Sequence, residues 1–553
     1  MGIKKLFKLA DSVVPHVAMA KMIGKLLPEE QVEICVHLRP KPSSPQLPSL
    51  EEFTDTPLSK RKYLSHKEFQ KLYGADPADV EKIKVFAREH GLHVEKVEPE
   101  HRCIHLKGTV KVMNAAFGVT LSMYKLGEEV FRAHPGPVHL PEELIGIVTG
   151  VLGLSNPEIA RPHEQSSEKE ESLKKKSSSE PDTPYFTGSS VASLYHFPVD
   201  TTGKGQSIGI IALGGGYKSE CLKEYFEKYI GIPMPNIIDV NVDDGHNNPG
   251  AKHYFDVETC GDIEVVGAVA PGADIVVYFA PDPSYLGFFK ALLTAIHDKK
   301  HKNSVISISW GTKEGTSSER GKKEDSFIKL MNLLLTEAAS LGITICASSG
   351  NFGSSDVYKD PEKDRCAHVD FPGSSPWTLG CGGTRIEAED NVIKSEVVWK
   401  NEKDKRASGG GVSAYFSCPP YQKKAGITPQ SVNEGGEVGR GVPDVSGNAA
   451  DYLIKTNENP VEKISGTSAV APLWAGLIAR LNQKLNTQLG FINPTLYEIR
   501  DSGVFKDITQ GNNQVYSWVP GYSAGPGWDA CTGLGSPNGE KLYEVLRKIL
   551  QKG

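Results

Sequence analysis

The amino-acid sequence predicts an α/β protein with a mainly parallel sheet flanked by helices, preceded by a smaller α+β domain. Two observations support this prediction. Residues 183–553 alternate short apolar strands with helices, and a segment rich in Ser, Glu and Lys separates them from residues 30–162, which follow a different pattern. At 553 residues the chain is long enough for about two to four domains.

The alternation is clearest in the first half of residues 183–553. Apolar strand segments such as QSIGIIAL, ADIVVYFA, SVISISW and ITICAS are separated by helix-like segments such as FFKALLTAIHD and IKLMNLLLTEAASLG. This order is typical of parallel strands joined by helices that cover both faces of the sheet. In such sheets, catalytic residues are expected at the C-terminal ends of the strands.

Residues 30–162 predict a separate α+β domain. VEICVHL resembles a strand, HKEFQKLYG and DPADVEKIKVFAREHG resemble capped helices, and LSMYKL with EVFRAH suggests a strand pair. Gly91 follows the second helix where a C-cap is expected. Residues 1–29 form an N-terminal segment that matches a secretory signal poorly, because Asp11 and Pro15 interrupt its apolar stretch; an amphipathic surface segment is the alternative.

Residues 163–182 are expected to be an exposed linker. They contain EQSSEKEESLKKKSSSEPD, which has no aromatic residue and cannot bury enough apolar surface to fold. Proteolytic cleavage concentrates in segments of this kind.

Composition argues against several classes of protein. With 39% hydrophobic residues, 24% charged residues and a formal net charge of −6, the chain lacks the basicity that nucleic-acid binding requires. Its apolar runs are interrupted by charged residues, Pro or Gly, so no membrane span is expected. The nine cysteines are an odd number without a CxxC pair, which implies neither a disulfide framework nor a zinc site.

A candidate nucleophile, Ser468, lies in the segment SGTSA directly before a helix-like segment of apolar spacing. Backbone N–H groups at a helix start are unpaired and can stabilise an oxyanion. An ordinary Ser or Thr N-cap is the alternative explanation of this segment.

A serine nucleophile needs a general base, and the histidines of this chain lie in no setting typical of serine hydrolases. Glu258 and Asp262 are four residues apart, so on a helix they share one face. Two like charges this close share a proton, which gives a general base for acidic pH. An acidic helix face is usually solvated, but this one continues into the nearly uncharged VVGAVA, which indicates burial.

These segments resemble the sedolisin family of serine-carboxyl peptidases, and within it the kumamolisins. The resemblance covers nearly all of residues 183–545, through GGGYKSECLKEYF, DIEVVGAVAPGADIVVYFAP, SVISISWG, HVDFPGSSPWTLGCGGT, GRGVPDVSGNA, SGTSAVAPLWAGLIARLN and GPGWDACTGLGSP. In the N-terminal domain, YLSHKEFQKLYGADPADVEKI and VMNAAFGVTLSMY resemble the activation prodomain of the family. The resemblance implies a subtilisin-like peptidase domain, here residues 183–553, and a prodomain that aids folding and blocks the cleft.

By this resemblance, Ser468 is the nucleophile, Glu258 is its base and Asp262 is the second carboxylate that orients the base. Relatives place an Asp in the oxyanion hole, and this chain has Asn351 there. An amide donates at any pH, and one good oxyanion donor lowers the barrier by about 3 kcal/mol, so activity should survive. Ala212 stands where the kumamolisins carry a Glu behind the base, so we expect a pH optimum nearer neutrality than is usual in the family.

Two C-terminal loops, FKDIT and AGPGWD, suggest a cation site. Two carboxylates together with backbone carbonyls suit a hard cation that takes six oxygen ligands, although Asp and Gly are also ordinary turn residues. The resemblance implies one calcium ion per subunit, bound by the side chains of Asp507 and Asp529 and by the carbonyls of Ile508, Gly525 and Gly527.

The resemblance also places Trp310, Asp370 and Gly410 at the substrate cleft, with a core position as the alternative for Trp310. The expected function is a serine endopeptidase, made as a self-processing proenzyme, that cleaves proteins or peptides at acidic to mildly acidic pH. We expect a monomer inhibited by its own prodomain. A tripeptidyl exopeptidase of the same family and an inactive peptidase-like binding protein are the alternatives. The resemblance implies secretion, whereas the poor signal segment leaves an intracellular location open.

Overall fold

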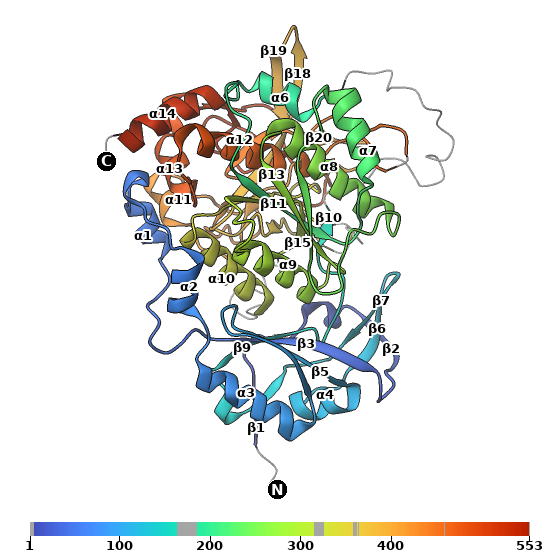
Figure 1. The fold of residues 1–553 in the computed structure, drawn as a ribbon. Coiled ribbons are helices and arrows are strands. Elements are labelled where there is room, and N and C mark those ends of the chain that lie inside the picture. Colours follow the sequence, from blue (N-terminus) through green and yellow to red (C-terminus); the bar gives the residue numbers. More distant parts are fainter. Residues whose placement is uncertain are drawn as a thin grey trace.

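The computed structural model describes residues 5–162, 185–314, 326–357, 362, 364–457 and 459–551. Figure 1 shows two bodies: an N-terminal domain at the bottom of the view, and a larger C-terminal domain above it. The predicted linker, residues 163–182, lies outside the described residues.

The C-terminal domain is built on an eight-stranded sheet, which confirms the predicted fold class. The strand order is β12-β13-β11-β14-β16-β18-β19, with β24 paired to β18. All pairings are parallel except the antiparallel hairpin β18–β19. Strands such as β11 are buried along their whole length, as expected of a parallel sheet covered on both faces. The bounds are β11 (Ser207–Leu213), β12 (Ile237–Asn241), β13 (Asp274–Ala280), β14 (Val305–Ile308), β16 (Thr344–Ser348), β18 (Leu379–Glu389), β19 (Val392–Val398) and β24 (Val445–Asn448).

Helices cover both faces of this sheet (Figure 1). On one face α8 (His253–Val269) packs against α12 (Val470–Leu485) and α6 (Gly188–Leu194), and on the other α9 (Tyr285–His297) packs against α10 (Ser326–Ser340). The other α-helices among the described residues of the domain are α7 (Ser219–Glu224), α11 (Pro420–Lys424), α13 (Asn493–Glu498) and α14 (Gly539–Gln551).

The N-terminal domain has a four-stranded antiparallel sheet in the order β4-β5-β3-β9 and two helices that pack on it. The predicted strand pair is confirmed as β6–β7, and the second predicted helix begins at the Asp76 N-cap and ends at Gly91, whose φ is 72°. The elements are β3 (Gln31–Leu38), β4 (His93–Glu98), β5 (Cys103–Thr109), β6 (Ser122–Leu126), β7 (Glu129–Ala133), β9 (Val148–Leu152), α3 (Pro77–His90) and α4 (Val110–Phe117).

Residues 5–29, which the sequence separates from this domain, contribute two strands to it. β1 (Leu6–Lys8) pairs with β8 (His139–Pro141), and β2 (Lys21–Lys25) pairs with β6. The N-terminal segment is therefore held by backbone hydrogen bonds to strands about a hundred residues or more away.

The N-terminal domain docks on helices α9 and α10. Gly150 of β9 lies against Leu330 of α10, where a Cβ would come within 2.4 Å of Leu330 Cδ1. Residues 49–74, with α1 (Leu50–Asp55) and α2 (His66–Tyr73), extend along the side of the C-terminal domain (Figure 1). Tyr63 in this arm donates a hydrogen bond to the carbonyl of Leu489 at 2.8 Å.

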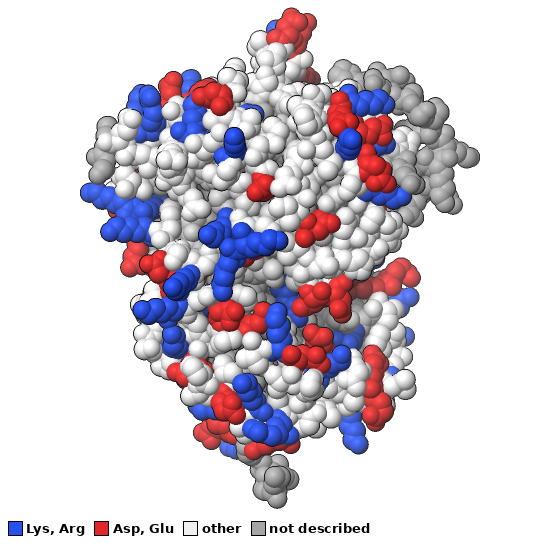
Figure 2. All heavy atoms as spheres, viewed as in Figure 1, with Lys and Arg blue, Asp and Glu red and all other residues white. Residues whose placement is uncertain are grey.

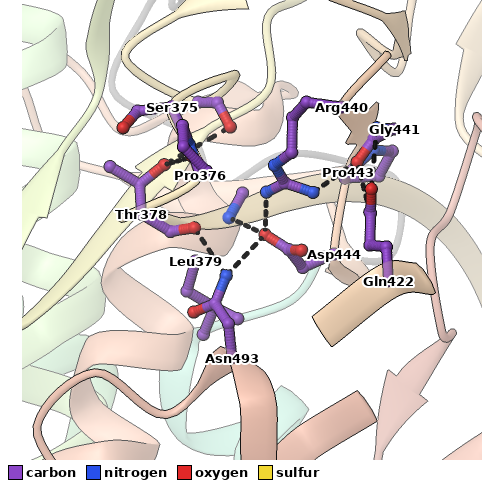
Figure 3. Close-up of polar contacts among 12 residues, drawn as sticks. Ser375, Pro376, Thr378, Leu379, Gln422, Arg440, Gly441, Pro443, Asp444 and Asn493 are labelled. Carbon is purple, nitrogen blue, oxygen red and sulfur yellow. Dashed lines mark hydrogen bonds and ion pairs between the residues drawn. The ribbon is translucent and has the colours of Figure 1, made fainter. Parts of the chain in front are cut away.

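A buried ion pair braces the segment that leads into β24 (Figure 3). Arg440 and Asp444 are fully buried and lie 2.5 Å apart. Asp444 also accepts hydrogen bonds from Gly380 N–H at 2.8 Å and from Asn493 Nδ2 at 3.2 Å, so its charge is compensated on several sides. This network fixes the start of β24 against the start of β18.

The surface carries both signs of charge, and Figure 2 shows acidic and basic side chains intermixed over the face viewed. Each of the nine cysteines is a free thiol, and eight of them are buried. No helix among the described residues is both long and apolar enough to cross a membrane.

Candidate active site

The two predicted carboxylates lie on α8, inside the protein. Glu258 and Asp262 are each only 1% exposed, and they occupy the same face of the helix one turn apart. The helix starts at His253, and from Phe255 onward every residue is buried. The expectation of a buried acidic face is therefore confirmed.

Ser468 lies at the N-terminal end of α12, in a single 3₁₀ turn (Thr467–Ala469) that precedes the α-helix. The α-helix itself begins at Val470, where the sequence predicted the helix to follow the SGTSA segment. This turn packs against α8. Ser468 is buried, and its Oγ makes no hydrogen bond among the described residues.

Ser309 connects the two parts of the site. Its Oγ donates to Asp262 Oδ1 at 2.7 Å and lies 3.4 Å from the backbone oxygen of Ser468. Ser309 comes directly after β14, at the C-terminal end of a central strand. The carboxylates of α8, the nucleophile turn and this strand end thus meet at the sheet edge where catalytic residues are expected.

Asn351 lies three residues beyond β16, on the other side of the nucleophile turn. Its Oδ1 accepts hydrogen bonds from Thr467 N–H at 2.7 Å and from Thr467 Oγ1 at 2.9 Å. These bonds hold the Asn351 side chain beside the nucleophile turn, and an amide nitrogen is the kind of donor that an oxyanion hole uses. The role of Asn351 stays a prediction, and so do the catalytic roles of Glu258, Asp262 and Ser468.

A short antiparallel sheet borders the site. Its central strand is β15 (Trp310–Lys313), which pairs on one side with β17 (Asp370–Phe371) and on the other with β10 (Arg161–Pro162). The residues of β10 end the N-terminal domain, so a piece of the chain itself occupies the outer position of this sheet.

The predicted substrate residues lie on or near this sheet. Asp370 lies against Gly311, where a Cβ would come within 1.8 Å of Asp370 Oδ1, so that position requires glycine. Trp310 is 1% exposed and packs edge-on against Phe255 of α8, while its backbone pairs with Pro162. The burial of its side chain agrees with a core position, and its contact with substrate stays a prediction. Gly410 packs against the carbonyl of Ala530, and its contact with substrate stays a prediction.

The predicted calcium residues lie in two loops that contact each other. Asp507 Oδ2 accepts a hydrogen bond from Gly527 N–H at 2.8 Å, and Asp529 Oδ2 accepts one from Gly525 N–H at 3.3 Å. Burial raises the pKa of Asp529 to about 6, although the carboxylate also accepts hydrogen bonds from the N–H groups of Cys531 and Thr532. Among the described residues there is no group of three or more His, Cys, Asp or Glu side chains that could bind a metal, and a site of two carboxylates and three carbonyls would not form such a group. This donor set fits calcium, which takes carbonyl as well as carboxylate oxygens.

Two features of the site were not predicted from the sequence. Ser309 was predicted only as part of a strand, and the pairing of β10 with β15 joins segments about 150 residues apart. Ala212, which the sequence did single out, is buried near the end of β11, and its effect on the pH optimum stays a prediction.

Comparisons with known proteins agree with this architecture. Residues 19–157 match the family model described as Pro-kumamolisin, activation domain, and residues 244–500 match the Subtilase family model. Kumamolisin of Bacillus sp. (strain MN-32) is 42% identical over 490 residues, which span 88% of this chain and 86% of that protein. Tripeptidyl-peptidase sed5 of Aspergillus fumigatus is 25% identical and covers 98% of both chains.

A solved structure of Pseudomonas sedolisin, a serine-carboxyl proteinase complexed with pseudo-iodotyrostatin, matches with a TM-score of 0.57 and 26% identity. The match spans 66% of this chain and 99% of that one. Together with the carboxylates of α8 beside a serine at the start of α12, these matches show that the chain belongs to the sedolisin family of serine-carboxyl peptidases, with a kumamolisin-type activation domain at its N-terminus.

Proposed function

We propose that this serine-carboxyl peptidase is an endopeptidase that matures by cleaving its own chain just beyond residue 162. The observation that supports this most directly is the course of residues 158–162, here called the lead-in segment. Glu158 forms a bridge with Ser284, and the next backbone N–H groups, of Ile159 and Ala160, donate to Pro283 O at 3.0 and 3.2 Å. The segment then pairs through β10 with β15.

The register of β10 directs the chain toward the nucleophile. Arg161 is opposite Gly311 and Pro162 is opposite Trp310, so β10 runs antiparallel to β15 and reaches the residue that directly follows Ser309. Ser309 lies beside Ser468. An extended peptide that adds a strand to an exposed sheet edge is a common mode of substrate binding, and the lead-in segment has this geometry.

The same geometry favours an endopeptidase over a tripeptidyl exopeptidase. An enzyme that removes tripeptides needs a cleft closed three residues before the bond it cuts. Here the five residues of the lead-in segment all precede the expected cleavage point and lie along the protein surface between residues 283–284 and 310–311. A cleft that accepts five residues on this side can accept the interior of a polypeptide.

The proposed chemistry assigns one role to each residue. Glu258 accepts the proton of Ser468 Oγ as the oxygen attacks the peptide carbonyl, and Asp262 shares the resulting proton. The Asn351 amide and the backbone N–H of Ser468 donate to the oxyanion. Glu258 then protonates the leaving amine, and a water molecule activated by the same carboxylate hydrolyses the acyl-enzyme. In this structure β10 of the lead-in segment is paired with β15, and Ser468 Oγ has no hydrogen bond among the described residues. Hydrogen bonds to a nucleophile often shorten only when a substrate is bound productively.

We further propose that one calcium ion binds Asp507 and Asp529 with the carbonyls of Ile508, Gly525 and Gly527. The ion would neutralise one carboxylate in each of the two loops and so rigidify both. Trp528, beside Asp529, donates to Pro443 O at 2.9 Å, next to the Arg440–Asp444 brace. Calcium binding would thereby stabilise the segment that leads into β24. We also propose that the enzyme acts outside the cell and that it is a monomer.

The test compares the wild-type chain with Ser468→Ala across acidic to neutral pH in the presence of calcium. Mass spectrometry follows chain length, and internally quenched peptides, free-N-terminus tripeptide substrates and casein separate the activities. Loss of the N-terminal domain and cleavage of quenched peptides by the wild type alone are expected. Release of tripeptides only would favour the exopeptidase, and inert chains of both kinds at every pH would favour the inactive binding protein.

A further inference from the structure

Ser309 is fully buried between β14 and β15, where the chain leaves the central sheet to form the edge of the cleft. It has contacts with both halves of the site: Asp262 Oδ1 at 2.7 Å and the backbone oxygen of Ser468 at 3.4 Å. A hydroxyl has one proton to donate. The shorter contact has the usual length of an O–H···O hydrogen bond, whereas 3.4 Å is too long for a strong one, so the proton points to Asp262.

We propose that Ser309 is a positioning residue, whose hydroxyl orients Asp262 and keeps the acid pair competent as a base at low pH. This inference rests on the proposed function. A donor on a carboxylate favours its ionised form, so the hydrogen bond from Ser309 opposes full protonation of the Glu258–Asp262 pair. Glu258 therefore stays available to accept the Ser468 proton at a lower pH than it would without Ser309.

The other charged groups around α8 have partners elsewhere. Glu264 accepts from Lys455 N–H at 3.0 Å and faces Tyr225 and Glu462, and burial raises its pKa well above the usual value. At the other end of the helix, Asp256 accepts from the N–H groups of Gly216 and Gly250 and from Asn457 Nδ2.

At the helix start, Lys252 pairs with Glu158 at 2.5 Å. The hydroxyl of Ser309 is thus placed to act on the Asp262 carboxylate specifically, while these outer groups are anchored to backbone or to each other.

The variant Ser309→Ala removes the hydroxyl donor and keeps a side chain of similar, small volume. A hydrogen bond to a charged group corresponds to a change of about tenfold to a hundredfold, so kcat should fall by that factor. KM should change little, because the backbone that binds the peptide is unaltered. The acid limb of the pH–rate profile should move to higher pH by about half a unit or more.

Two conservative variants and one matched control complete the design. Ser309→Thr and Ser309→Cys keep a donor at this position and should recover part of the kcat and of the acid limb, and two replacements guard against failure of one to fold. Ser307→Ala is the control, since Ser307 is equally buried on β14 and its Oγ has no hydrogen-bond partner among the described residues. Its pH profile should match that of the wild type.

The outcomes separate this inference from the proposed function. A wild type without any Ser468-dependent cleavage would refute the proposed function itself. If the wild type is active but Ser309→Ala and Ser307→Ala have the same kcat and the same acid limb of the pH–rate profile, only the role of Ser309 is overturned. Equal losses in kcat for all Ser309 variants, with no movement of the limb, would also overturn it, because they would indicate a packing effect alone.

Discussion

The contact between the N-terminal and C-terminal domains contains buried titratable groups, and they predict that acid loosens it. His37 of β3 packs edge-on against Phe289 of α9, with ring centroids 5.6 Å apart, and burial together with the charge of Arg102 lowers the pKa of His37 to about 3. His297, at the end of α9, lies 2.8 Å from Glu337 of α10, and its pKa is also lowered by burial. Arg102 of the N-terminal domain pairs with Glu337 across the contact.

The direction of the pH effect follows from these shifts. A histidine with a lowered pKa is neutral in the docked state, and it binds a proton below about 6.5 once the domains separate and it regains its ordinary pKa. The separated state then holds more protons, so docking weakens as pH falls below about 6.5. Glu337 acts at lower pH: burial would raise its pKa, but Arg102 and His297 lower it to about 2, so its contribution is lost between about pH 4 and 2.

Other groups at the contact add to the same trend or are already paired. Burial lowers the pKa of His66 on α2, whose ring lies 6.4 Å from that of His297. The ring of His101 lies 5.3 Å from His297, and His101 also pairs with Glu98 at 3.4 Å. Asp298 is hydrogen-bonded to His301, and although burial opposes this, these bonds lower its pKa. Between about pH 4 and 6.5, the weakening of docking is therefore attributed to protonation of the histidines.

The size of the effect can be worked out for His37. Each pH unit below 6.5 and above the docked pKa of about 3 costs the docked state about 1.4 kcal/mol. At pH 4.5 this amounts to about 2.7 kcal/mol, or roughly a hundredfold in the opening equilibrium. His37→Gln cannot take up the proton, and its amide can still bond to Thr149, which lies 2.6 Å from His37 Nδ1. The variant should open up to about a hundredfold less at pH 4.5 and equally at pH 7.

Hydrogen exchange measured by mass spectrometry on β3 and α10, in a Ser468→Ala background that prevents self-cleavage, reports this opening. The rates are corrected for the intrinsic pH dependence of exchange. His93→Gln is the matched control, because His93 lies on the same domain with 74% of its side chain exposed. Identical pH dependence of opening in His37→Gln and its parent would refute the reasoning.

Five further variants test the site and the residues that support it. Asn351→Ala should lower kcat by about 10²–10³-fold, whereas Asn351→Asp should confine activity to acidic pH, as pH–rate profiles would reveal; equal activity of both at every pH would count against an oxyanion role. Asp444→Asn should destabilise the protein by about 3–5 kcal/mol in denaturant unfolding, since it leaves the buried Arg440 charge uncompensated. Asp507→Asn should abolish the gain in melting temperature that calcium gives the wild type, and an unchanged gain would place the ion elsewhere. Ala212→Glu should move the pH optimum toward acid, and a wild-type optimum well below pH 4 would contradict the expectation on which it rests.

The sequence predicted the fold because its main elements are defined locally. The strands around Ile210 and Ile306 are apolar along their length, and the helices between them carry enough apolar residues to cover both faces of the sheet. The acid pair on α8 could also be predicted from the sequence, because a spacing of four residues places both side chains on one helix face without knowledge of the tertiary structure.

Features that depend on contacts between distant segments could not be predicted from the sequence. β10 has two residues, and nothing in Arg161 and Pro162 specifies pairing with Trp310 and Gly311. β2 carries no alternating pattern that marks it as a strand, and its partner lies about a hundred residues away in β6. The proposed role of Ser309 could not be predicted either, because it arises only when α8 and α12 pack against the same strand end.

The lead-in segment and the acid-sensitive contact have a joint consequence for the proposed maturation. A cut just beyond residue 162 leaves the lead-in segment attached to the N-terminal domain, with Glu158 bound to Lys252 and β10 still paired with β15. The cleft is then freed only when that domain departs, and its departure depends on the contact that contains His37 and His297. On this proposal, cleavage alone does not release activity, and we expect protonation of the buried histidines at the domain contact to help set the pH at which substrate can enter.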